Sequence, residues 1–165
     1  MQYDAKGKFI RYFGGKGTEA HQFDCCHGIT IDSREGKPPT LLITSRSANE
    51  FKRFTMDGNY LETISLPGCY ICRPVLKNNM LYFAVIVTKD WGKYDGMLAV
   101  LNTKNEVVSL PGGSIPKYNN NAFLAPEYDQ KTFFNPHDVC IDDDENIYVP
   151  QWNSGKTYPL KLTRV

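Results

Sequence analysis

Two stretches of the chain share one pattern: FDCCHGITID at residues 23–32 and FFNPHDVCID at residues 133–142. Both follow Phe-x3-His-x-[Ile/Val]-x-Ile-Asp, which places His27 and His137 at matching positions, 110 residues apart. Because the chain has only three histidines, a pattern that carries two of them is unusual. A repeated unit of this kind indicates a repeat architecture and makes the paired histidines the first candidates for a site.

A second repeated pattern marks turns between strands. It occurs as YDAKGKFI at residues 3–10, FTMDGNYL at 54–61 and, more weakly, LNTKNEVV at 101–108, at spacings of 51 and 47 residues. Each copy has the character of a strand end, a tight turn at Asp, Gly or Asn, and the start of the next strand. A period of about 50 residues with several short strands per unit is the signature of a β-propeller blade. We therefore predict an all-β fold.

The repeat divides residues 1–165 into one propeller segment of about three blades. We expect the outer strand of a blade at 1–15, full blades at 16–66 and 67–112, a connecting loop at 113–132, and an incomplete last blade at 133–165. Three blades cannot close a ring by themselves, because propeller rings have about four to eight blades. We expect the segment to be half of a six-bladed ring. Either upstream blades complete the ring or two copies join as a homodimer, because unpaired blade edges favour aggregation.

Composition excludes several function classes. A net charge of +1 provides no electrostatic footprint for nucleic acid, and no apolar run is long enough to span a membrane. The first residues lack the features of a signal peptide. The odd count of five cysteines argues against a complete disulfide framework. Cys69 and Cys72 form a lone Cys-x-x-Cys pair, which favours buried thiols over a redox or zinc site.

His27 and His137 each precede the expected inner strand of a blade. Inner strands face the central channel of a propeller, so both imidazoles are expected at one mouth of that channel, where they could converge on a metal ion. The alternative is that each ring bonds a neighbouring backbone carbonyl. Asp138 follows His137 directly and could bind calcium. Its alternative role is to cap backbone N–H groups in a turn.

Arg46 follows the second strand of its blade and could present a planar guanidinium to a substrate carboxylate. A surface salt bridge is the alternative role for this side chain. Trp152 lies at the corresponding place in the last blade, where it could stack on a ligand or join the core. Within the second blade, the composition of residues 91–96 predicts a polar and aromatic loop.

Together these motifs resemble the NHL repeat of six-bladed propellers. The resemblance is carried by QF-x3-HGI-x-ID at residues 22–32, T-x-R-x2-N at 44–49, DG-x-YL at 57–61, NPHDV at 135–139 and NIYV at 146–149. It covers nearly the whole chain. Within that group, the chain is similar to the C-terminal half of the peptidyl-α-hydroxyglycine α-amidating lyase family and its bacterial relatives.

In that lyase family a zinc ion held by three histidines lies in the channel. The resemblance implies that His27 and His137 are two of these ligands, that Asp138 helps to bind a structural calcium, and that Arg46 lies in the active site and holds the carboxylate of a peptide-like substrate. The implied reaction splits a C–N bond to release a peptide amide and glyoxylate. The implied setting is secreted, or extracytoplasmic.

The sequence also departs from the family. The third zinc histidine and the catalytic tyrosine belong to blades upstream of the matched residues. Cys25 and Cys26 replace the usual apolar residue and proline before the first histidine. The competing function is that of a non-catalytic scaffold that binds a peptide, glycan or protein partner on its channel face, since propellers serve both purposes.

Overall fold

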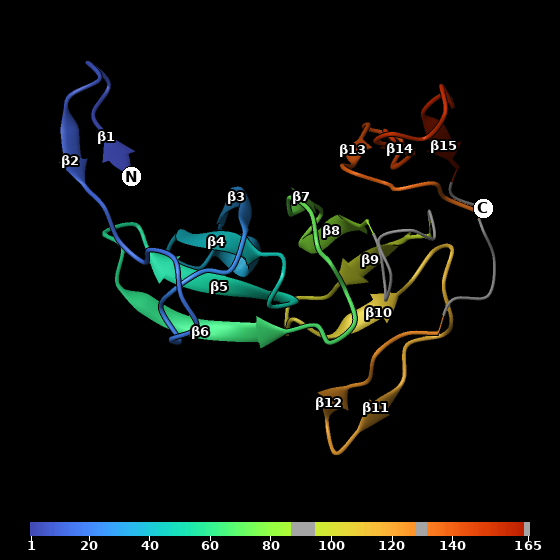
Figure 1. Cartoon of the computed structure of the whole chain (residues 1–165), viewed down its shortest axis with the longest axis horizontal. Coiled ribbons are helices and arrows are strands. Elements are labelled where there is room, and N and C mark those ends of the chain that lie inside the picture. Colours follow the sequence, from blue (N-terminus) through green and yellow to red (C-terminus); the bar gives the residue numbers. More distant parts are fainter. Residues whose placement is uncertain (87–94, 128–131, 164–165) are drawn as a thin grey trace.

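The computed structural model describes residues 1–86, 95–127 and 132–163 (Figure 1). The strands of these residues form antiparallel sheets, and the single helical turn among them is Arg34–Gly36. The aromatic loop expected at residues 91–96 falls largely outside the described residues. No helix in the described part of the chain has the length and apolar character needed to cross a membrane.

The first large sheet has four strands in chain order. They are β3 (Cys26–Asp32), β4 (Thr40–Ser45), β5 (Glu50–Thr55) and β6 (Tyr60–Ser65). Side chains alternate between its two faces, as the pleat of a strand requires. Leu42 and Phe51 lie on one face, and Ile43 and Phe54 on the other. A register shift in β3 between Cys26 and Ile29 separates the end that carries His27 from the rest of the strand.

The second large sheet repeats this arrangement. Its strands are β7 (Val75–Lys77), β8 (Met80–Val85), β9 (Met97–Leu101) and β10 (Val107–Ser109), again in chain order. Asn78 and Asn79 join β7 to β8 with φ of 49° and 61°. Two consecutive left-handed residues are what a two-residue hairpin turn of type I′ needs, and asparagine tolerates that conformation well.

The last sheet has three strands: β13 (Cys140–Ile141), β14 (Ile147–Val149) and β15 (Leu160–Leu162). Two small hairpins complete the described strands. They are β1 (Gln2–Tyr3) with β2 (Phe9–Arg11), and β11 (Tyr118–Asn119) with β12 (Ala122–Phe123). The β1–β2 hairpin projects away from the large sheets in Figure 1.

The β11–β12 hairpin lies within residues 113–132, which were expected to form a connecting loop. Asn120 and Asn121 have φ of 47° and 64°, so they form the same kind of turn as the asparagine pair before β8. The flanking strands are only two residues long. Strands this short give almost no periodic signal, which is why the sequence did not reveal them.

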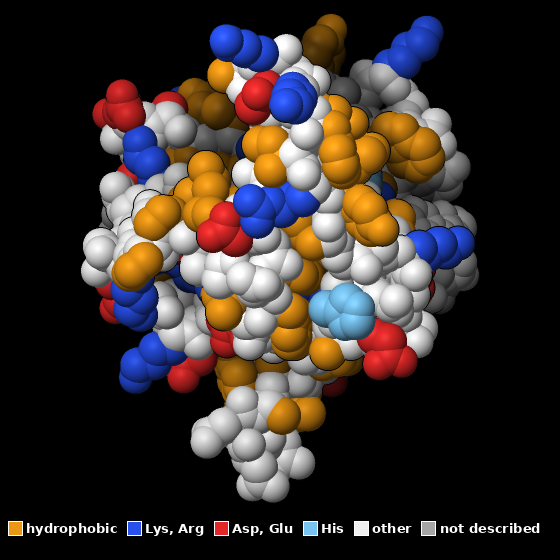
Figure 2. All heavy atoms as spheres, turned by 90° about the vertical axis from the view of Figure 1, so that its left-hand side faces the viewer, with side chains coloured by type: hydrophobic (Ala, Val, Ile, Leu, Met, Phe, Trp, Pro, Cys, Tyr) orange, Lys and Arg blue, Asp and Glu red, His pale blue; other side chains and the backbone are white. Residues whose placement is uncertain are grey.

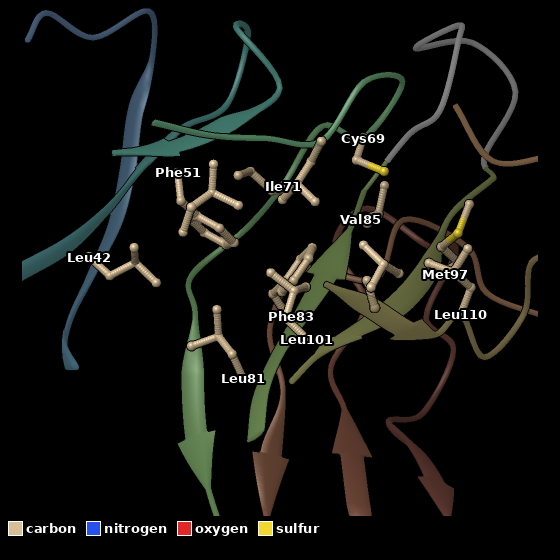
Figure 3. Packing of buried hydrophobic residues seen from close by; sticks show 14 residues of the cluster. Leu42, Phe51, Cys69, Ile71, Leu81, Phe83, Val85, Met97, Leu101 and Leu110 are labelled. Carbon is tan, nitrogen blue, oxygen red and sulfur yellow. The ribbon is translucent and has the colours of Figure 1, made fainter. Parts of the chain in front are cut away.

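The core lies between successive sheets. Phe51 of β5 and Phe83 of β8 meet edge to face, with ring centroids 5.0 Å apart, in the cluster that joins the first and second sheets (Figure 3). A second cluster joins the second and last sheets, where Leu98 packs with Val139 and Val149. Sheets of in-order antiparallel strands that pack face to face are the blades of a β-propeller. The predicted all-β propeller fold is therefore confirmed.

A charged cluster also joins the first two sheets, at the end of β3 away from His27. Asp32 accepts hydrogen bonds from Arg34 Nε and Nη2 (3.0 and 2.8 Å) and from Arg53 Nη1 (2.7 Å). Arg34 then reaches across to the β9–β10 turn, where it donates to Asn102 O and Asn105 Oδ1 (2.7 Å each). We call this cluster the Asp32 clamp.

Candidate functional site

The structure brings His27 and His137 together. His27 is the second residue of β3, and His137 lies just before β13, where its backbone N–H donates to Pro150 O at 2.9 Å. The two imidazole centroids are 5.0 Å apart and the ring planes are nearly perpendicular, at 85°. Among the described residues, neither ring donates to a backbone carbonyl. Two side chains that are 110 residues apart in the sequence therefore lie next to each other in the structure.

Both rings are held in the neutral form near pH 7. Burial is the main cause that lowers the pKa of His27 to about 4, and the charges of Arg46 and His137 lower it further. Burial and the Arg46 charge likewise lower the pKa of His137. Neutral imidazoles have a free nitrogen lone pair, which is the form that coordinates a metal ion.

Arg46 lies close enough to act on both rings and is only 7% exposed. Its Nε donates to Ile71 O at 3.2 Å and its Nη2 to Cys72 Sγ at 3.1 Å. It makes no ion pair within the described residues, which excludes the expected alternative of a surface salt bridge among them. Nε and Nη2 of the guanidinium are therefore bonded to the chain, and Nη1 has no hydrogen-bond partner within the described residues.

The Asp138 carboxylate is bonded to other groups of the chain. Its Oδ2 forms an ion pair with Arg73 Nη2 at 3.0 Å, and its Oδ1 accepts from the Val139 N–H at 2.9 Å. Arg73 in turn lies against Gly28, where a Cβ would come within 2.6 Å of the Arg73 Cα. Asp138 thus links the last sheet to the segment that precedes β7 and packs on β3. Calcium binding at this carboxylate stays a prediction.

Trp152 lies at the rim of the site. Its ring centroid is 6.5 Å from that of His137, at an interplanar angle of 36°, and its side chain is 54% exposed. Of its two expected roles, the core position does not fit this exposure. A half-exposed indole beside an imidazole is placed to contact a ligand that enters from solvent.

The donor set fits a zinc ion in part. Neutral imidazoles are common zinc ligands, and catalytic zinc sites use about three protein ligands. His27 and His137 match two of these. Across the described ranges, no group of three or more His, Cys, Asp or Glu side chains is already arranged to hold a metal. We therefore assign no reaction step to a metal.

A groove of about 1060 Å³ opens beside His27. Its lining comes from the residues before β3, from β3 itself and from β4, and includes Tyr12, Phe13, Cys25 and Ile29. Tyr12 and Ile29 are 77% and 53% exposed. Figure 2 shows this end of the molecule, where hydrophobic side chains gather between charged ones. The groove offers an apolar and aromatic surface next to the histidine pair.

Comparisons with known proteins add little to this picture. No protein-family model and no curated protein matches the chain. Among solved structures, that of a streptogramin B lyase is similar with a TM-score of 0.49 and 12% sequence identity, over 86% of this chain and 41% of that chain. This chain therefore spans about two fifths of that lyase. A likeness at this level transfers no activity.

Proposed function

We propose that the chain is the site-bearing half of a six-bladed NHL-type propeller that binds zinc at its channel mouth and acts as an amidating-lyase-like enzyme. One observation carries the proposal. Two neutral imidazoles from separate sheets meet at 5.0 Å beside Arg46, a buried cation that has no carboxylate partner among the described residues. An arrangement of metal ligands next to an unpaired cation suits a substrate that carries a carboxylate.

The roles of the side chains follow from their chemistry. His27 and His137 would hold the metal through their free ring nitrogens. Zinc there would supply a Lewis acid that lowers the pKa of a bound hydroxyl group. Arg46 would bind the substrate carboxylate, since a buried charge gains much from an opposite charge in a low-dielectric setting. Trp152 would cover the substrate from the solvent side.

The groove supports a second candidate function, that of a non-catalytic scaffold. Its aromatic lining and the exposed side chain of Ile29 suit the apolar residues of a peptide or protein partner. In this case the histidine pair would stabilise the channel mouth and bind no metal.

Zinc binding separates the two candidates. Isothermal titration and elemental analysis of the purified chain should show about one zinc per chain, or about one per two chains. The variant H27A/H137A should lose this zinc and keep its sheet content by circular dichroism. The matched control is H21A, which removes the remaining histidine, exposed in a loop. Equal zinc binding by H27A/H137A would exclude this site.

Carboxylate recognition is tested with a pair of ligands. A peptide that ends in α-hydroxyglycine should bind the zinc-loaded chain more tightly than the same peptide with a terminal carboxamide. Arg46→Met should abolish the difference, whereas Arg11→Met, at an arginine whose side chain is 41% exposed, should preserve it. Zinc binding without any preference for the carboxylate would support a metal-stabilised scaffold.

A further inference from the structure

Arg46 and Trp152 hold equivalent positions in the first and last sheets. In both sheets one bridge joins the segment that carries the histidine to the end of the next strand or to the residues after it. These bridges are Cys26 to Ser45 and Pro136 to Gln151. Arg46 follows the bridge in the first sheet, and Trp152 follows it in the last. His27 and His137 are equivalent in the same way, because each follows the other residue of its bridge.

Backbone geometry supports the same correspondence. The Arg46 N–H donates to Cys25 O at 3.0 Å, and the Trp152 N–H donates to Asn135 O at 2.9 Å. Both acceptor residues have a left-handed backbone, with φ of 58° for Cys25 and 55° for Asn135. Because equivalent positions in the blades of a propeller have the same orientation to the channel, Arg46 and Trp152 belong to one channel mouth.

The second sheet has a buried residue at this position. Its bridge joins Ile71 to Val85, and the Ile86 N–H donates to Tyr70 O at 3.0 Å. Ile86 is therefore equivalent to the arginine and the tryptophan, but only 1% of it is exposed. The three equivalent positions thus hold a cation, a buried aliphatic side chain and an indole. The cation and the indole are the two that can meet a ligand.

The exposure of these side chains orders them from the inside of the site to the outside. Arg46 is 7% exposed, both imidazoles are partly buried, and Trp152 is 54% exposed. The Trp152 ring centroid lies 6.5 Å from that of His137, which in turn lies 5.0 Å from that of His27. A ligand whose carboxylate binds Arg46 would therefore pass the histidines and have its outer part beside the indole.

A second aromatic side chain lies next to Trp152. Phe134 is 39% exposed, and its backbone N–H donates to the Gln151 side chain. The next residue, Asn135, accepts the Trp152 N–H, so hydrogen bonds join the two segments that carry the aromatic rings. In the first sheet Asp24 takes the place of Phe134, two residues before the bridge. The aromatic pair is thus a feature of the last sheet, and we call Phe134 and Trp152 the aromatic rim.

We propose that the aromatic rim binds the residue that precedes the α-hydroxyglycine, and that the substrates are peptides with an aromatic side chain at that position. This inference rests on the proposed function, which places the substrate carboxylate at Arg46. The order of groups in the site then matches their order along the peptide. The guanidinium meets the carboxylate, the imidazoles lie beside the α-hydroxyl group, and the rim meets the preceding residue, since aromatic rings pack well on one another.

Two peptides test this preference by isothermal titration of the full chain, with and without added zinc. Both end in α-hydroxyglycine, and the preceding residue is Phe in one and Ser in the other. The Phe peptide should bind at least about threefold more tightly, since one aromatic pair contributes about that much to affinity. Trp152→Ser should remove the preference. The matched control Tyr3→Ser should keep it, because Tyr3 is similarly exposed, at 51%, but lies on the β1–β2 hairpin that projects away from the large sheets (Figure 1).

The fluorescence of Trp152 reports the same contact directly. The chain has two tryptophans, so Trp91→Phe leaves Trp152 as the only indole. Its emission should move to shorter wavelength when the Phe peptide binds, because the ring leaves water, and should move less with the Ser peptide. This measurement requires no change in the rim itself.

The outcomes separate this inference from the proposed function. Equal affinity for the Phe and Ser peptides, with the preference for the carboxylate over the carboxamide intact, would overturn the aromatic rim alone. A Phe preference that persists in W152S would overturn it as well. Loss of the carboxylate preference would overturn the proposed function and, with it, the substrate assigned to the rim. A shift of Trp152 emission with cellohexaose, and with neither peptide, would make the rim a glycan site and overturn the inference.

Discussion

The Asp32 clamp offers a sharp test of what holds the blades together. Asp32 has 4% of its side chain exposed, and its carboxylate joins the guanidinium of Arg34, 6% exposed, to that of Arg53, 14% exposed. Asp32→Ala removes the negative charge and leaves both cations in place. Arg53 still pairs with Glu62 at 2.7 Å, so Arg34 is the residue whose charge is left without a carboxylate.

The size of the effect follows from this geometry. Removal of one partner from a buried ion pair costs about 3–5 kcal/mol, because the remaining charge stays desolvated. Arg34 keeps its hydrogen bonds to Asn102 and Asn105, so we expect a loss near the lower end, about 3 kcal/mol of unfolding free energy. With a urea dependence of about 1–3 kcal/mol per M, the unfolding midpoint should fall by at least about 1 M.

Urea unfolding followed by circular dichroism measures this loss at pH 7. The matched control is Asp142→Ala, because Asp142 ends the second copy of the same motif. Asp142 accepts hydrogen bonds from the Asn146 side chain and the Tyr148 hydroxyl, at 2.9 and 3.1 Å, and from no arginine within the described residues. Its removal should shift the midpoint less. Equal shifts for the two variants would refute the clamp.

The clamp also predicts a pH window. Burial acts to raise the pKa of Asp32, but hydrogen bonds from Arg34 and Arg53 outweigh it and hold that pKa well below its usual range. A depressed folded-state pKa gives stability that is complete above the unfolded value of about 4 and is lost as pH falls through the folded value. The difference between wild type and D32A should be constant from about pH 7 to pH 5 and shrink only in stronger acid.

Two further predictions concern the site. Arg46→Met should raise the pKa of His27 and His137 in an NMR titration, because the arginine charge lowers both pKa values. The control Arg46→Lys keeps the positive charge and should keep both pKa values low. Unchanged pKa values in R46M would place the guanidinium away from the rings. Gly28→Ala should lower the unfolding free energy by about 1–3 kcal/mol, since its Cβ would come within 2.6 Å of the Arg73 Cα. An unchanged urea midpoint would show that β3 and the segment before β7 can move apart without loss of stability.

Most of the strands could be predicted from the sequence, because long apolar runs alternate with Gly and Asn turns. The strand end, turn and strand start expected at residues 54–61 are the end of β5, the turn at Gly58 and the start of β6. The two-residue strands of the β11–β12 hairpin have no period by which the sequence could predict them. The only sequence signal of this hairpin is its Asn120–Asn121 turn, which matches the asparagine pair at residues 78–79.

Of the candidate site, the sequence predicted the part that belongs to the repeated motif. The shared motif placed His27 and His137 together, whereas nothing in the sequence showed that Arg46 is buried or that Arg73 pairs with Asp138. Both depend on packing between sheets, which local patterns do not encode.

The geometry of β3 explains how one short strand can serve both stability and a site. Its seven residues, Cys26–Asp32, span about 20 Å at roughly 3.3 Å per residue. At one end Asp32 holds Arg34, whose guanidinium hydrogen-bonds to the second sheet, while the other end holds His27 near Arg46 and beside His137. Within the described residues the His27 ring makes no hydrogen bond, and a register shift separates this end of β3 from the end that the clamp holds. The His27 ring nitrogens are therefore open to a ligand in that part of the structure.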